Sequence, residues 1–384
     1  MQQPEQVPLW RNTRVIKFVG QGLVLVIVAI TLAYLGSNLI ANFRRLNLTF
    51  GFNFLSRPSS FGIADPPIAY RPTDPYTRAL LIGLLNSLRV MFFGIIIAVV
   101  LGISVGIGRL SNNWLVRRLA GVYVEILRNT PLLLQLFFWY FAVFLRLPKI
   151  ERPLVVGDRI FLTNRGLDIP WFAATLPTWL SLGAIIGCIL MAVAAWNLRD
   201  REIERGRNPQ LWIGLLSISA IAIVLLFVFG IEWVVPQLQN NLIRGGLNLS
   251  PEFATLLIGL GIYTSAFIAA VVRAGLQSVS LGQWEAAKAL GLKPSAMMQL
   301  VIFPQALRVI IPPLTSEFLN LAKNSSLAIA IGYSDIYAIG STISNQTGKS
   351  LEILAIVMAV YLTIDLIVSW IMNRFNSLVQ LKER

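Results

Sequence analysis

The feature that most constrains this chain is a series of long apolar stretches separated by short polar segments. A helix rises about 1.5 Å per residue, so about 20 apolar residues cross a membrane core in which lipid offers the backbone no hydrogen-bond partner. Eight stretches meet or approach this length, and 56% of the 384 residues are apolar. The sequence therefore predicts an all-α, polytopic membrane protein with about eight transmembrane helices. The predicted spans lie near Val15 to Ile40, Ala79 to Gly108, Leu119 to Leu145, Thr175 to Asn197, Leu211 to Glu232, Phe253 to Val272, Thr315 to Gly340 and Ile353 to Asn373.

The spans and their connections predict a division of the chain into three parts. Residues 1–78 are predicted to hold a retained anchor helix and an outer loop, because the first span is too long for a removed signal peptide. Residues 79–373 are predicted to form the main transmembrane domain, and residues 374–384 a cytoplasmic tail. Within that domain we expect a core (79–145 and 252–373), an inserted helix pair (146–251) and a cytoplasmic loop (276–314).

Cations in the short loops indicate the orientation of the spans. Placing the arginine-rich loops inside puts both termini in the cytoplasm and makes the long loops Ala41 to Arg78 and Arg146 to Ala173 extracytoplasmic connectors or small caps. The net charge of +14 then faces anionic lipid, and nothing requires nucleic acid. The inner cations used for this assignment are Arg11, Arg14, Lys17, Arg109, Arg117, Arg118, Arg199, Arg201, Arg205 and Arg207.

The composition excludes several kinds of enzyme. The chain has no histidine, which excludes a Ser-His triad and a histidine-ligated metal, and its one cysteine, Cys188, lies in an apolar run. Gly348-Lys349-Ser350 ends like a phosphate-binding loop, but Ile343 stands where the first glycine belongs. We therefore expect no catalytic residue, bound metal or bound cofactor in this chain.

Two pairs of glycines have the spacing that lets membrane helices approach closely. These are Gly102 with Gly106, and Gly183 with Gly187. Both pairs are interpreted as helix-packing faces.

The loop after the sixth span has the signature of two short helices joined at a glycine. The residues from Glu285 to Leu290 are mostly strong helix formers, Gly291 suits a left-handed helix stop, and Pro294 suits the first turn of a second helix. Ala286, Ala287 and Leu290 would give the first helix a narrow face of small and apolar groups that fits a groove in another protein.

This loop resembles the EAA loop of bacterial ABC importer permeases. The matching residues are Glu285, Ala286, Ala287, Gly291 and the run from Val301 to Pro304, in which Val301 and Phe303 replace the usual Ile and Leu. The resemblance implies that the loop forms a coupling helix that docks on an ATPase subunit.

A second resemblance narrows the family. The run from Glu125 to Gln135 is similar to the E-x-x-R-[GN]-T-P-L-L-x-Q signature of polar amino-acid permeases. The resemblance covers about 78–145 and 252–373, and the rest is similar to the eight-span general L-amino-acid permeases. It implies a bacterial inner-membrane importer with two ATP-binding subunits that use ATP and Mg²⁺, a second permease copy or paralogue, and an extracytoplasmic amino-acid-binding protein.

Ionisable residues inside predicted spans are candidates for the substrate path. Arg89 lies near mid-depth beside Asn86, where it would meet the α-carboxylate of an amino acid or pair with Asp365. Glu125 and Arg128 share a helix face and would form either an ion pair or a substrate contact.

Lys323, Asn324 and Ser325 interrupt the seventh span and suit a polar gate or a substrate path. Asp365 would carry protons if the chain were instead a secondary transporter driven by an ion gradient. That alternative class usually shows paired repeats with interrupted helices, and we detect none here.

Overall fold

The computed structural model describes residues 13–45, 50–204, 208, 210–240 and 242–379. The predicted inner cations Arg11, Arg205 and Arg207 and the tail residues 380–384 lie outside this part of the chain. The structure divides into two compact units, residues 1–55 and 56–384. It is 74% helical, and the described residues include seven helices suited to spanning a membrane, or eight if a bent pair counts as one span. The predicted helical membrane fold is therefore confirmed.

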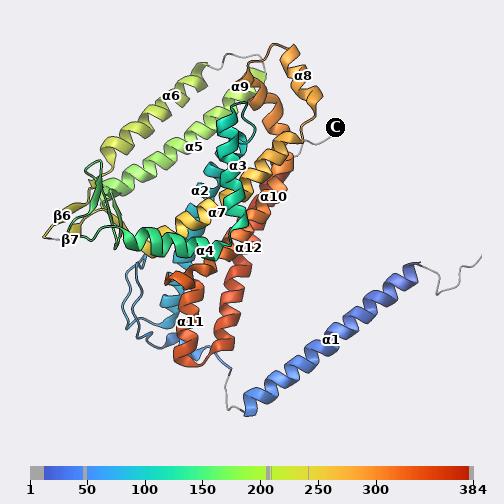
Figure 1. Cartoon of the computed structure of the whole chain (residues 1–384), viewed down its shortest axis with the longest axis vertical. Coiled ribbons are helices and arrows are strands. Elements are labelled where there is room, and N and C mark those ends of the chain that lie inside the picture. The colour runs from blue at the N-terminus through green and yellow to red at the C-terminus, as the bar shows by residue number, and fades with distance from the viewer. Residues whose placement is uncertain (1–12, 46–49, 205–207, 209, 241, 380–384) are drawn as a thin grey trace, which may run out of the picture. The chain divides into compact units, whose positions relative to one another are not determined.

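The first unit contains the first predicted span. Helix α1 (Thr13–Arg45) is a single long helix, drawn in blue in Figure 1, and its apolar part runs from Lys17 to Asn42. A short turn, η2 (Asn53–Ser56), follows at the boundary of the unit.

The second unit is a bundle of long helices with several short ones at its two ends (Figure 1). Its long core helices are α2 (Tyr76–Gly108), α3 (Trp114–Asn129), α7 (Pro251–Gln277), α10 (Phe303–Asn324) and α12 (Ser350–Val379). Its shorter segments are α4 (Leu132–Phe137), η3 (Phe138–Val143), η4 (Phe144–Arg146), α8 (Leu281–Ala289), α9 (Pro294–Met297), η6 (Met298–Ile302), η7 (Ser325–Ile331) and α11 (Ile336–Thr347).

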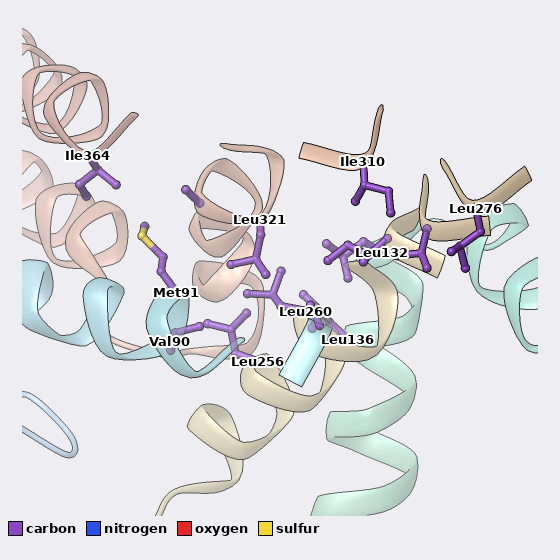
Figure 2. Packing of buried hydrophobic residues seen from close by; sticks show 14 of the residues in the cluster. Val90, Met91, Leu132, Leu136, Leu256, Leu260, Leu276, Ile310, Leu321 and Ile364 are labelled. Carbon is purple, nitrogen blue, oxygen red and sulfur yellow. The ribbon is translucent and has the colours of Figure 1, made fainter. Parts of the chain in front are cut away.

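Helices α2 and α7 pack side by side and run in the same direction. A Cβ atom added at Gly102 would lie 2.6 Å from Ile268, and one added at Gly106 would lie 2.9 Å from Val272. The predicted packing face on α2 is therefore confirmed. Beside it, Leu256 and Leu260 of α7 meet apolar side chains of α2, α4 and α10, which together form the core shown in Figure 2.

The third predicted span is not one straight helix. Between α3 and the segment Leu132–Arg146 the chain turns by 105°. The cause is Pro131, which lacks a backbone donor and holds Thr130 in an extended conformation (φ −105°, ψ 126°). The amide of Gln135 donates to the carbonyls of Leu127 and Thr130 at 2.9 Å each, and so satisfies backbone groups that the break leaves free.

The seventh predicted span begins earlier and ends earlier than expected. The structure places it at Pro294–Ile331, so α10 starts inside the predicted cytoplasmic loop and continues through Pro312 and Pro313. Gly332, with φ +80°, ends the segment, and α11 follows as a separate short helix against α2. The boundaries Thr315 and Gly340 were therefore wrong.

The inserted region contains α5 (Leu176–Glu204), α6 (Gln210–Leu225) and η5 (Leu226–Gly230), whose main packing partners are one another. No described atom lies within 4 Å of a Cβ added at Gly183 or Gly187, so this second glycine face has no partner within the described chain.

The loops around these helices contain short strands that the sequence did not predict. The strands β1 (Leu154–Val156), β2 (Ile160–Thr163), β3 (Gly166–Ile169) and β8 (Leu247–Leu249) form an antiparallel sheet in that order. Two small ribbons pair β4 (Trp171–Phe172) with β5 (Trp233–Val234), and β6 (Gln237–Gln239) with β7 (Leu242–Arg244). Because β8 leads directly into α7, the sheet lies at the start of that helix.

Candidate functional site

The loop after α7 forms a compact helix-turn-helix unit. Helix α8 ends where the backbone N–H groups of Leu290 and Gly291 donate to the carbonyls of Ala286 and Lys288, at 3.0 and 2.9 Å. Gly291 has φ +71° and open space around its missing side chain. Glycine is favoured here by the left-handed backbone and not by crowding, so a side chain at this position would strain the turn between α8 and α9.

Helix α8 has an inner face and a free face. Ala287 is 2% exposed, and Trp284 packs against the main apolar cluster. Glu285 and Ala286 are exposed, and Leu290 is 78% exposed. The two alanines of the motif therefore point differently: Ala287 anchors the helix, while Ala286 lies on the free surface with Glu285 and Leu290.

The far end of the motif lies beside the same helix. Pro304 is exposed in the first turn of α10, where its missing N–H costs no hydrogen bond. The next residue, Gln305, donates from Nε2 to Oε1 of Gln283 in α8 at 3.0 Å. This contact ties α8 to the start of a long core helix.

A second set of predicted residues lies on α3. Glu125, Arg128 and Asn129 are exposed, and they line a cavity of about 350 Å³ together with Arg109 and Phe267. The guanidinium of Arg128 lies 5.1 Å from the centre of the Phe267 ring. Among the described residues, the ion pairs within 4.0 Å include none between Glu125 and Arg128, so the structure does not support the ion-pair interpretation.

The cavity beside α3 has an excess of positive charge. Burial lowers the pKa of the Arg109 guanidinium below its usual value, and the charges of Arg273 and Arg128 act in the same direction, while Glu125 opposes them. Three guanidinium groups and one carboxylate thus influence this region, so its electrostatic potential favours an anionic group.

Helix α10 carries a polar stripe along its exposed side. Ser316, Asn320 and Lys323 are exposed at a spacing of about one turn each. Nζ of Lys323 lies 3.5 Å from Oδ2 of Asp365 in α12. The alternative that paired Asp365 with Arg89 was therefore wrong.

The neighbours of Lys323 differ in exposure. Ser325 is fully buried, and its hydroxyl donates to the Ala322 carbonyl at 2.8 Å, which is a local contact at the end of α10. Asn324 is half-buried in the last position of the helix. Lys323 is therefore the member of the predicted trio that faces outward most.

Asn86 and Arg89 lie on α2, beside the turn that precedes α11. Asn86 is fully buried and donates from Nδ2 to the Ser334 carbonyl at 3.0 Å, so it fastens the turn before α11 to α2. Arg89 donates to the Tyr333 hydroxyl at 3.4 Å, and its guanidinium lies 4.2 Å from the centre of the Phe253 ring. Because Phe253 is in the first turn of α7, Arg89 lies at the level where α7 begins, beside the sheet.

The aromatic partners of the two arginines were missed at the level of sequence. Phe253 and Phe267 lie on α7, whereas Arg89 and Arg128 lie on other helices. No local spacing connects such pairs, so only the packing of helices reveals them. Gln135 belonged to the recognised signature, but its hydrogen bonds at the break after α3 could not be predicted, because the bend itself was not predicted.

Comparisons with known proteins agree with this arrangement. A family described as "Binding-protein-dependent transport system inner membrane component" matches residues 209–380. A putative amino-acid ABC transporter permease, YhdX of Escherichia coli, is 42% identical over 97% of this chain and 96% of its own length. The general L-amino acid transport system permease AapQ of Rhizobium johnstonii is 40% identical over 95% and 92%, and the glutamate/glutamine/aspartate/asparagine permease BztB of Rhodobacter capsulatus is 39% identical over 97% and 96%. This chain belongs to the family of amino-acid ABC transporter permeases, the multi-pass inner-membrane components of binding-protein-dependent transport systems.

Proposed function

We propose that α8 and its turn transmit movement between this permease and two separate ATPase subunits, which bind and hydrolyse ATP with Mg²⁺. The observation that supports this proposal most strongly is that α8 has one face packed on the bundle and one exposed face. Ala287 and Trp284 hold the helix to the bundle, while Glu285, Ala286 and Leu290 are presented to a partner. A small, partly apolar free face suits a groove in another protein, and the hydrogen bond from Gln305 to Gln283 gives a route from α8 to α10.

This assignment sets the orientation. The end of the bundle that carries α8 faces the cytoplasm together with both termini, as the arginine-rich loops favour. The sheet and α11 then face outward, toward an extracytoplasmic amino-acid-binding protein that delivers substrate.

The substrate path is proposed along the polar side of α3 and α10. Charged and amide side chains at membrane depth need water or polar partners, and lipid supplies neither. Glu125, Arg128, Lys323 and Asn324 therefore face a second permease, a copy or a paralogue, with the path between the two subunits. Ser325 is buried and stabilises the end of α10 through its hydrogen bond to the Ala322 carbonyl.

The transported molecules are proposed to be L-amino acids. A zwitterion carries one carboxylate and one ammonium group, and Arg128 and Glu125 offer the complementary charges in one cavity. A relative named for general L-amino acid transport supports a broad range of side chains.

A matched pair of glycine variants tests the coupling role. Gly291→Ala strains the left-handed turn after α8 by about 1–2 kcal/mol, whereas Gly282→Ala changes a glycine inside α8 that also has open space but no positive φ. In reconstituted importer, Gly291→Ala and Glu285→Lys should lower amino-acid uptake per ATP hydrolysed, and Gly282→Ala should leave it unchanged. Equal uptake per ATP in all of these variants would reject the coupling role.

The path has its own test. Ser316→Trp, on the exposed stripe of α10, should block uptake, whereas Leu362→Trp, at a 60% exposed apolar position of α12, should leave uptake intact. The reverse pattern would place the path elsewhere.

A further inference from the structure

A second cavity, of about 480 Å³, lies where α2 and α7 meet the sheet. Its volume is within the range of about 300–1,000 Å³ that is usual for small-molecule sites. The outer loop before α2, both helices and the strand region all contribute to its walls. Its lining includes Asp65, Arg89, Trp171, Leu247, Leu249 and Phe253.

Arg89 has hydrogen-bonding capacity to spare at this cavity. A guanidinium has five N–H donors, and within the described chain the one hydrogen bond recorded for it is the 3.4 Å contact from Nη2 to the Tyr333 hydroxyl. None of the ion pairs among the described residues involves Arg89. The guanidinium lies over the Phe253 ring, 4.2 Å from its centre, which holds the group at the cavity wall. A guanidinium held there can make two parallel hydrogen bonds to a carboxylate.

The rest of the cavity complements a particular kind of carboxylate. Asp65 provides a negative charge, and its position is fixed because the backbone N–H of Ser250 donates to its Oδ2 at 3.2 Å. Trp171, Leu247 and Leu249 provide apolar walls. A molecule with one anion, one cation and an apolar body matches this distribution.

This cavity is separate from the one beside α3. Phe253 stacks under Arg89 and Phe267 under Arg128, and the two phenylalanines are 14 positions apart in α7, which corresponds to about 21 Å along a helix. The cavity lined by Arg89 lies at the sheet end of the bundle, and the cavity lined by Arg128 lies toward the end that carries α8.

We propose that the cavity beneath the sheet is an entry site that holds an amino acid with an apolar side chain before it reaches the path between the subunits. Arg89 binds the α-carboxylate, Asp65 faces the α-ammonium group, and Trp171, Leu247 and Leu249 contact the side chain. The proposal rests on the proposed import function and adds to it a second binding site with its own side-chain preference.

Equilibrium binding of radiolabelled L-leucine and L-alanine tests the site, with the permease and its ATPase in nanodiscs and without the binding protein. Arg89→Gln should weaken L-leucine binding about tenfold or more, because hydrogen bonds to charged groups are worth about that factor. Leu247→Trp fills the cavity and should reduce L-leucine binding much more than L-alanine binding. The matched control is Leu242→Trp, at a 47% exposed position of the β6–β7 ribbon outside the cavity, which should bind both amino acids normally.

The outcomes separate this proposal from the import function on which it rests. Unchanged binding in Arg89→Gln and Leu247→Trp, with loss only in Arg128→Gln, would overturn the entry site and leave the path between subunits standing. Displacement by oleate or an anionic phospholipid but by no amino acid would also overturn it, because the cavity would then hold lipid. The same purified protein, reconstituted in proteoliposomes, can be assayed for ATP-driven uptake. That assay tests the import function independently of the binding measurement.

Discussion

Substitution of Gly102 by alanine is a direct probe of the contact between α2 and α7. The added Cβ would lie 2.6 Å from both Cβ and Cγ2 of Ile268 and 3.0 Å from the Ser265 carbonyl. Carbon atoms pack at about 3.5–4.0 Å, so the two helices would have to separate by about 1 Å. Overpacking of this kind typically costs about 1–3 kcal/mol, and the cost falls on the pair of helices that positions both arginine cavities.

The matched control is Gly183→Ala in α5. Its added Cβ meets no described atom within 4 Å, and alanine favours a helix over glycine by up to about 1 kcal/mol. The assay is the thermal unfolding of purified permease, followed by light scattering and fluorescence in the same detergent. Gly102→Ala should unfold at a clearly lower temperature, while Gly183→Ala should match or exceed the parent.

A second substitution tests the cause of the loss. Ile268→Leu removes the Cγ2 atom but keeps the side-chain volume, so combining it with Gly102→Ala should recover part of the lost stability. Equal effects of the two glycine variants, or a combined effect that is simply additive, would refute the close-contact explanation.

Three other outcomes follow from single interactions. Lys323→Met should lower thermal stability by about 1–3 kcal/mol, because the partly buried Asp365 carboxylate loses its partner, and adding Asp365→Leu should restore it. Gln135→Leu should destabilise the permease by about 1–3 kcal/mol, measured in the same unfolding assay, because two carbonyls lose their donor. Burial raises the pKa of Asp168, which accepts a hydrogen bond at 2.8 Å within the sheet. Its ionised form is therefore less favourable in the folded sheet than in the unfolded chain. The protection of the β3 amides, measured as their exchange rate relative to an unfolded peptide at the same pH, should rise as pH falls through that raised pKa toward the ordinary value of 3.8, and the rise should be smaller in Asp168→Asn.

The long helices were predictable because each crosses the membrane as an apolar run, and this physical requirement is visible in the sequence itself. The break at Pro131 was not predicted, because the apolar residues on both sides make one continuous run although the proline ends the helix. The helix of the seventh span starts before the predicted boundary at Thr315 and runs through Pro312 and Pro313, although proline usually breaks a helix.

Only those features of the candidate site that depend on residues close together in the sequence were predictable. Gly291 could be assigned to a left-handed stop from its neighbours, since a helix end is a local structure. The stacking of Arg89 on Phe253 joins residues of two helices, and the cavity above it also needs Leu247 from a strand of three residues. Such short strands have too few positions to show a periodic pattern, so the sheet and its cavity emerge only from the fold.

Uptake of a radiolabelled L-amino acid into proteoliposomes tests the central claim most directly. The vesicles contain this permease, its partner permease if it has one, and the ATPase, with ATP on the α8 side and the binding protein on the other side. We predict uptake that requires ATP, continues in the presence of an uncoupler, and is largely lost in Glu285→Lys. Uptake by this chain alone that follows an ion gradient and ignores ATP would contradict the account and support a secondary transporter instead.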